Sequence, residues 1–230
     1  MIIALRGPTW VYILDAVVQF IVAFIAIIVC YYGYKAYKVS KDKRRLYFSS
    51  AFGLIGLNLL LFAIIIPALF IYYNFFPGVD VGKFSYISGI LNLIYIFATL
   101  MAYTLFVFIY AKIKRKGTKI LLTLLVLGLA IHSFIKVSSL SFNLVAILLL
   151  SFILIYVVRN CLKKRTINSW LVLFTFGLIL SSHLLFITAL QYNNFYFFAH
   201  LTQLIGYSIL FILFMRINYG WASRKISNNR

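Results

Sequence analysis

Seven long apolar runs, separated by short polar connections, take up most of the chain. The runs lie at residues 12–34, 46–72, 84–110, 120–135, 142–158, 170–190 and 195–215, the fourth and fifth being shorter than the rest. A helix needs about 20 mostly apolar residues to cross the hydrocarbon core of a bilayer, and most runs reach that length. They lack the alternation of polar and apolar positions that a transmembrane strand requires. Because lipid offers the backbone no hydrogen-bond partner, the pattern predicts an all-α, polytopic bundle of seven transmembrane helices.

Lys and Arg fall almost entirely on alternate connections between these runs. Of the 22 Lys and Arg residues, only Arg6, Lys83 and Lys136 lie on the other set. Basic residues in short loops resist translocation, so the rich side is predicted to be cytoplasmic. We therefore expect a multi-pass protein of the cell membrane with its N-terminus outside and its C-terminus inside. The cytoplasmic basic face is expected to include Lys41, Lys43, Arg44, Arg45, Lys114, Arg115, Lys116, Lys163, Lys164 and Arg165.

The composition excludes an ordinary soluble domain. The chain is 64% hydrophobic, with a mean hydropathy of +1.03, so residues 1–230 are expected to form a single integral membrane domain. Its three acidic residues leave a formal net charge of +19. The basic face is expected to attract anionic lipids, at about 1 kcal/mol per cationic residue near the surface. A nucleic acid is the alternative polyanionic partner.

An internal similarity links the first two spans to the fifth and sixth. One constant shift along the chain aligns Tyr32 with Tyr156 and Lys35 with Arg159. The same shift aligns two further segments, Phe52–Ile55 with Phe176–Ile179 and Leu60–Phe62 with Leu184–Phe186. The matching spans have the same orientation, which predicts a three-plus-one-plus-three parallel repeat with the fourth span as a connector. Transporters built from such repeats bind their substrates where the repeats meet.

A small set of polar residues interrupts the apolar spans, all in the half of the membrane away from the basic face. The candidate cluster comprises Asp15, Gln19, His132, Ser182, His183, His200 and Gln203. Ionisable groups within lipid are energetically costly, so Asp15 and the three histidines are functional candidates. The Gln and Ser residues add hydrogen-bonding groups at similar or slightly greater depth. His183 and His200 lie on consecutive spans at depths that differ by only about 3 Å, so their rings can meet.

Three interpretations of this cluster remain open. The side chains can be structural, they can line a path for a solute or proton, or a His pair can hold a metal or haem. The spans lack the His pair at positions i and i+4 that identifies a helical metal site, so no metal or cofactor is assigned. No nucleophile elbow, P-loop or dinucleotide fingerprint occurs either. The seven-span lipid hydrolases combine Ser, Asp and His, but their paired His motif is missing here, and we expect no enzyme.

The first basic connection carries a resemblance. Tyr34–Lys38 followed by Lys43–Phe48 resembles the first inner loop of many uncharacterised archaeal seven-helix membrane proteins. The overall plan is also similar to the polytopic component of the archaeal DNA-import machinery. The parallel repeat, the polar cluster and the absence of a catalytic motif together predict a non-enzymatic translocation subunit or small transporter, with a membrane or cytoplasmic ATPase as a candidate partner. A receptor or sensor that signals through a separate protein is the first alternative, and a haem- or metal-binding membrane subunit is the second.

Overall fold

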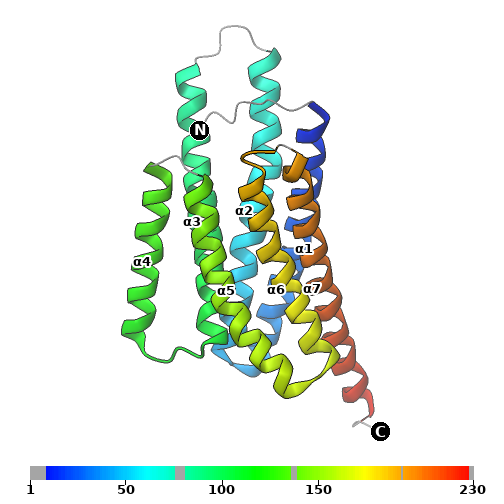
Figure 1. Cartoon of the computed structure of the whole chain (residues 1–230). Helices are drawn as coiled ribbons and strands as arrows, with labels where there is room; N and C mark the ends of the chain where they lie inside the picture. The colour runs from blue at the N-terminus through cyan, green and yellow to red at the C-terminus, as the bar shows by residue number, and fades with distance from the viewer. Residues whose placement is uncertain (1–8, 76–80, 136–138, 193, 228–230) are drawn as a thin grey trace.

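The computed structural model describes residues 9–75, 81–135, 139–192 and 194–227 as seven α-helices without a strand (Figure 1). The helices are α1 (Thr9–Ser40), α2 (Lys43–Phe75), α3 (Val81–Tyr110), α4 (Lys116–Ile135), α5 (Ser139–Lys164), α6 (Ile167–Thr188) and α7 (Asn194–Ser227). All seven are long and apolar enough to cross a membrane. The protein is therefore a multi-pass integral membrane protein, as the apolar runs predicted.

Most helices extend beyond the predicted apolar runs. One example is α5, predicted as a short span but formed by 26 residues that continue through Arg159 to Lys164. A prediction from apolar residues ends the span at the first charged residues. The helix itself continues through them, because its backbone hydrogen bonds extend into the membrane interface. The predicted Pro77-Gly78 turn lies outside the described residues.

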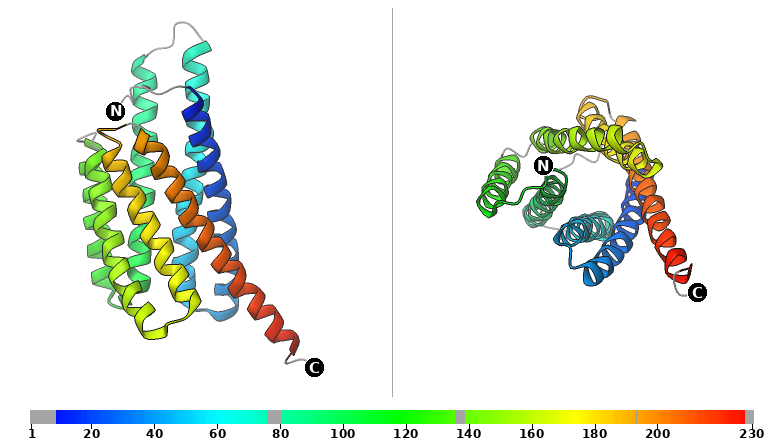
Figure 2. Two further views of the ribbon diagram at one scale, coloured as in Figure 1. Left: turned by 45° about the vertical axis from the view of Figure 1, so that its right-hand side comes forward. Right: turned by 90° about the horizontal axis from the view of Figure 1, so that it is seen from below.

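Six of the helices close into a ring, and α4 lies outside it (Figure 2). Around the ring, α1 packs against α2, α2 against α3, α3 against α5, α5 against α6, and α6 against α7. Contact between α7 and α1 completes the ring, so the first and last helices are neighbours. α4 packs only against α3 and α5 among the described helices. Its outward face is apolar, with Leu121 and Leu124 exposed as expected for a surface in contact with lipid.

The interior is held largely by aromatic side chains on α2, α3 and α6. The ring of Phe106 on α3 lies 5.2 Å from Phe52 on α2 and 5.4 Å from Phe176 on α6, measured between centroids. Edge-on contacts of this kind each contribute about 0.5–1.5 kcal/mol beyond the burial of apolar area. The three helices are thereby joined across the ring, although α2 and α6 are not neighbours in it.

Helices α1 and α2 approach one another closely because small residues line their contact. A methyl group built on Gly56 would lie 2.9 Å from the Ile27 side chain and 3.2 Å from the carbonyl oxygen of Ala23. Closer to the basic connection, the Ser49 hydroxyl donates a hydrogen bond of 2.7 Å to the Cys30 carbonyl oxygen. Without a hydrophobic driving force between helices in lipid, such close backbone packing and interhelical hydrogen bonds favour association.

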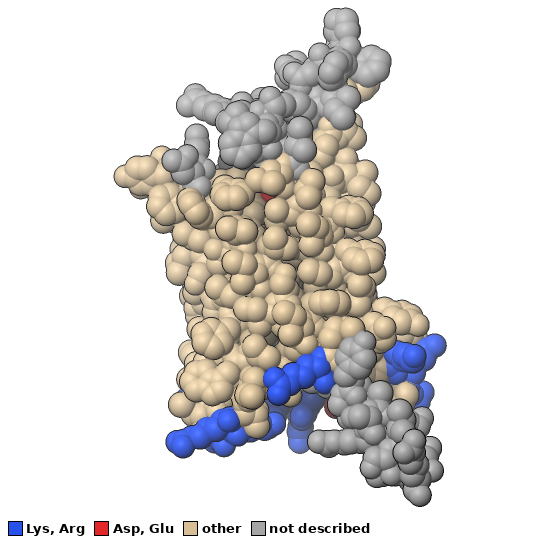
Figure 3. All heavy atoms as spheres, turned by 90° about the vertical axis from the view of Figure 1, so that its right-hand side faces the viewer, with Lys and Arg blue, Asp and Glu red and all other residues tan. Residues whose placement is uncertain are grey.

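Lys and Arg gather at one end of the bundle, which we call the basic end (Figure 3). It comprises the α1–α2, α3–α4 and α5–α6 connections together with the helix ends that adjoin them. It carries all ten residues predicted for the basic face. One other cation at this end is engaged in helix packing: the Lys119 ammonium donates to the Tyr47 hydroxyl at 3.0 Å and lies over the Tyr47 ring. At the start of α2, Asp42 acts as a cap, because its carboxylate accepts the Arg44 backbone N–H at 3.0 Å.

Each of these three connections has a basic residue in the left-handed backbone region at its first or second position. The φ angles are 56° at Lys41, 54° at Lys112 and 48° at Arg165. The Lys41 and Arg165 N–H groups bond back to carbonyl oxygens four residues earlier, as in an αL helix cap. Glycine is the usual residue there, because a Cβ atom makes this conformation unfavourable.

Replacing Lys41 with glycine is therefore expected to stabilise the protein by about 1 kcal/mol, because the strain of the left-handed conformation is removed. Lys41→Ala is the matched control, since it removes the same charge and keeps a Cβ atom. The free energy of unfolding in detergent should rise for Lys41→Gly and not for Lys41→Ala. Equal effects of the two substitutions would assign the change to the charge instead of the backbone.

Candidate functional site

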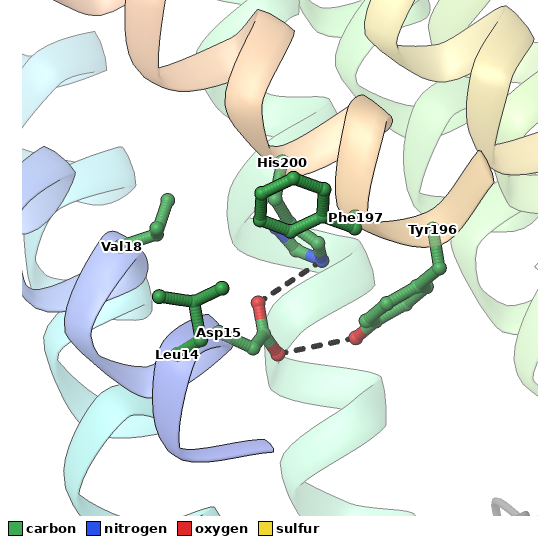
Figure 4. A pocket seen from close by; sticks show the side chains of 6 residues that line it. All are labelled: Leu14, Asp15, Val18, Tyr196, Phe197 and His200. Atoms are coloured by element: carbon green, nitrogen blue, oxygen red, sulfur yellow. Dashed lines mark hydrogen bonds and ion pairs between the residues drawn. The ribbon is translucent and has the colours of Figure 1, made fainter. Parts of the chain in front are cut away.

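The membrane-embedded carboxylate Asp15 of α1 faces Tyr196 and His200 of the last helix, α7 (Figure 4). Its Oδ2 atom accepts hydrogen bonds from the Gln19 amide at 2.9 Å and from the Tyr196 hydroxyl at 3.1 Å. Its Oδ1 atom lies 3.1 Å from Nε2 of His200. We call Asp15, Gln19, Tyr196 and His200 the Asp15 site.

Helix geometry explains why these four side chains meet. Asp15 and Gln19 are four residues apart on α1, and Tyr196 and His200 are four apart on α7, so each pair shares one helix face. The contact between α1 and α7 turns the two faces toward each other. Aromatic rings close the site: the His200 ring lies 4.6 Å from Tyr196 and 4.8 Å from Phe186, between centroids.

The contact between Asp15 and His200 leaves one buried polar atom of each side chain without a hydrogen bond. Oδ1 and Nε2 are close, but their orientation does not make a hydrogen bond, and both atoms are buried without another hydrogen-bond partner. We regard the contact as electrostatic, because the two atoms are close without hydrogen-bond geometry. Buried polar atoms of this kind are costly unless water or an ion completes their coordination, so the site is prepared to accept one more group.

A small pocket adjoins the Asp15 site, and its lining is mostly apolar. The lining residues are Leu14, Asp15, Val18, Tyr196, Phe197 and His200. The pocket volume is about 10 Å³, close to the smallest cavity that holds one water molecule. The pocket therefore suits a water molecule or a proton, and it is too small for an organic solute in this conformation.

A second polar group lies deeper in the bundle, around His183 of α6. The Nδ1 atom of His183 is 2.8 Å from Oδ1 of Asn143 on α5, and its Nε2 atom is 2.9 Å from the Tyr103 hydroxyl on α3. The Tyr103 hydroxyl also hydrogen-bonds Tyr207 of α7, which in turn interacts with the Gln203 amide. We call these five residues the His183 network. It joins four helices through side chains that are all buried.

The polar residues expected from sequence are divided between these two groups. Asp15, Gln19 and His200 belong to the Asp15 site, whereas His183 and Gln203 belong to the His183 network. Among the described residues, no contact between the two histidine rings is recorded; Phe186 packs against both, with its ring centroid 6.2 Å from that of His183 and 4.8 Å from that of His200.

Two other expected members lie apart from both groups. Ser182 is buried but donates to the Ile179 carbonyl oxygen of its own helix at 2.7 Å. His132 is exposed on α4, which contacts neither α1, α6 nor α7 in the described part of the chain. In the same part, no three His, Cys, Asp or Glu residues are grouped so that they could hold a metal ion.

Sequence reasoning did not include four residues of these groups: Tyr103, Asn143, Tyr196 and Tyr207. Asn143 carried a usable signal, because an amide within an apolar run is as costly as the residues that were selected. Nothing in the sequence distinguishes the three tyrosines from the chain's other tyrosines, since Tyr is common near membrane interfaces.

No protein-family model, curated protein or solved structure matches this chain. The class defined by the fold is a seven-helix, multi-pass integral membrane protein. Its function is therefore argued from the two polar groups and from the way the helices pack.

Proposed function

We propose that the protein is a non-enzymatic translocation subunit or small transporter of the cell membrane, and that the Asp15 site lies on its path. The observation that carries this proposal is the contact between a carboxylate and an imidazole beside a water-sized pocket, within helices that cross lipid. Ionisable pairs inside membrane proteins are costly and typically mark ion or proton pathways. The basic end faces the cytoplasm in this proposal, and the Asp15 site is reached from outside.

The helix contacts support the parallel repeat that the sequence predicts. A twofold rotation that exchanges α1–α3 with α5–α7 would pair the contact α1–α2 with α5–α6 and the contact α2–α3 with α6–α7. The same rotation would pair the contact α1–α7 with α3–α5. The remaining contacts involve α4, which suits a connector outside the repeat. The two halves would then meet at α1–α7 and at α3–α5.

The pattern of buried positions supports the same repeat. The buried residues of α6 are Thr175, Phe176, Ile179, Ser182 and His183. The shift found in the sequence aligns them with Ala51, Phe52, Ile55, Asn58 and Leu59 of α2, which are buried too. On α1 and α5, the same shift aligns buried Val22, Ala26 and Val29 with buried Ala146, Leu150 and Ile153.

The position of the polar groups in this arrangement favours transport. The Asp15 site lies at α1–α7, one of the two contacts between the proposed halves. The His183 network includes Tyr103 and Asn143, which belong to the other contact, α3–α5. Rocking of one half against the other, as in repeat transporters, would change both contacts together. A cytoplasmic ATPase at the basic end is the partner that fits an energised translocation subunit.

The proposal is tested with purified protein in lipid vesicles, by following the entry of protons, monovalent cations and small neutral solutes. At least one of these species is expected to enter faster than in protein-free vesicles. Asp15→Asn should return that rate to the protein-free level, because the amide cannot carry the carboxylate's charge or accept a proton. Asp42→Asn is the matched control, since Asn is an equally good helix cap at the exposed start of α2.

Two results would contradict this function. One is the absence of entry above the protein-free level for every species, with the protein folded and inserted. The other is equal behaviour of Asp15→Asn and Asp42→Asn, which would remove the Asp15 site from the path.

A further inference from the structure

The His183 network forms an ordered chain of hydrogen bonds with a single direction. The Oδ1 atom of Asn143 accepts only, so the Nδ1 atom of His183 must carry a hydrogen. The Nε2 atom is then the acceptor, and the Tyr103 hydroxyl donates to it. The Tyr103 oxygen remains free to accept from the Tyr207 hydroxyl, and the Tyr207 oxygen to accept from the Gln203 amide. Each ring nitrogen of His183 and each tyrosine hydroxyl in the chain thus has a partner.

One face of α7 leads from the Asp15 site to this chain. His200, Gln203 and Tyr207 follow one another at steps of three and four residues, so they lie along one stripe of the helix. Each step along the stripe advances about 5 Å into the bundle. Tyr95 of α3 lies within electrostatic range of Asp15 and of both Tyr103 and Tyr207, and it provides a second connection.

Small residues flank the two tyrosines that face each other in the chain. Tyr103 lies in the segment Ala102-Tyr103-Thr104 of α3, and Tyr207 lies in Gly206-Tyr207-Ser208 of α7. Both side chains are almost fully buried.

We propose that His183 is an internal proton-binding site, supplied from the Asp15 site through the hydroxyls of Tyr207 and Tyr103. This inference rests on the proposed function and names the proton as the species that its path takes up. The chain contains groups that both donate and accept, as proton transfer requires, and the pocket at its entrance admits a water molecule and nothing larger.

The transfer balances with one proton and no change of oxidation state. A proton from external water binds at the Asp15–His200 pair and reaches the Tyr207 oxygen through water. The former Tyr207 hydrogen passes to the Tyr103 oxygen, and the former Tyr103 hydrogen passes to Nε2 of His183. Both tyrosines end neutral, and His183 becomes an imidazolium whose Nδ1–H still donates to Asn143. For net transfer, Nε2 releases the proton toward the basic end once the two proposed halves have rocked, and rotation of the two tyrosine hydroxyls restores the starting state.

Among the described residues, the recorded partners of the His183 ring nitrogens are neutral groups, the Tyr103 hydroxyl of α3 and the Asn143 amide of α5. Tyr95 of α3 and Tyr207 of α7 lie within electrostatic range of Tyr103. Phe142 and Phe186 pack against the His183 ring. Loading of His183 therefore depends on delivery through the hydroxyl groups.

The experiment uses vesicles that contain the full chain and a pH-sensitive dye, with the external solution made more acidic. Tyr103→Phe and Tyr207→Phe each remove one hydroxyl and keep the ring. Each is expected to slow acidification of the lumen roughly tenfold or more, the size of effect typical of a lost proton-transfer group. Tyr110→Phe is the matched control on α3, where the ring packs against Phe176 outside the chain, and its rate should equal that of the unmodified protein. Thermal unfolding of each variant verifies that the bundle is intact.

The outcomes separate this inference from the proposed function. Slow acidification with Tyr103→Phe and Tyr207→Phe but not with Tyr110→Phe supports the relay. Normal acidification with both variants, together with loss of acidification in Asp15→Asn, overturns the relay and leaves the transport function standing. A third outcome is that the lumen acidifies no faster than in protein-free vesicles, while another species enters at a rate that depends on Asp15. That result would show that the transported species is not the proton. Equal slowing by all three tyrosine variants also overturns the relay, since it would reflect packing.

Discussion

Replacing Gly56 with alanine is expected to lower the free energy of unfolding by about 1–3 kcal/mol, the usual cost of overpacking a close contact. The added methyl group would lie 2.9 Å from the Ile27 side chain and 3.1 Å from the Ile27 backbone nitrogen. Two of its three nearest neighbours are backbone atoms of α1, so no side-chain rotation relieves the clash. Helices α1 and α2 must move apart, and that movement also disturbs the α1–α7 contact that holds the Asp15 site.

Gly177→Ala on α6 is the matched control for this substitution. A methyl group there meets nothing within 4 Å, and alanine is the better helix former, so stability should be unchanged or slightly higher. Unfolding of both variants in the same detergent measures the difference. If the two substitutions have the same effect, the close approach of α1 and α2 is not what makes Gly56 sensitive.

Replacing His183 with phenylalanine is expected to destabilise the bundle by roughly 1–3 kcal/mol, although the ring fits the same aromatic surroundings. The substitution removes the acceptor of the Tyr103 hydroxyl and the donor to Asn143, while Phe142 and Phe186 continue to pack on the ring. Because His183 is almost fully buried, bulk water cannot replace these hydrogen bonds, and their loss lowers the stability of the folded protein.

The control for this second substitution is His132→Phe on α4. His132 is exposed toward the surroundings of the bundle, so phenylalanine there should change the free energy of unfolding by less than about 0.5 kcal/mol. Comparable destabilisation by the two substitutions would mean that the hydrogen bonds of His183 contribute nothing to the fold.

Much of the fold follows from hydrophobicity alone. The seven apolar runs correspond to the seven helices, because length and hydropathy suffice to identify a spanning helix. The gathering of basic residues at one end was also predicted from the connections in which they lie. The ends of the helices were less well predicted, as α5 illustrates, since charged residues can extend a helix beyond the apolar part of the membrane.

The sequence predicted several residues of the candidate site but not which of them lie together. Asp15, His183 and His200 were selected because ionisable groups are costly in lipid, and all three have polar contacts. Their separation into two groups was not predictable, because it depends on the rotation of each helix about its axis. Phe186 packs against both imidazole rings, which belong to different polar groups.

The sequence by itself determined that this protein is a bundle of seven apolar helices with its cations at one end, because both properties follow from the free energy of transfer into lipid. The tertiary structure decided that α1 meets α7, that α4 stays outside the ring, and that two tyrosines join His183 to the other helices. A helix that is apolar all round has no preferred face in the sequence. Its neighbours are chosen by the shapes of small residues and by a few interhelical hydrogen bonds, which only the folded arrangement brings together.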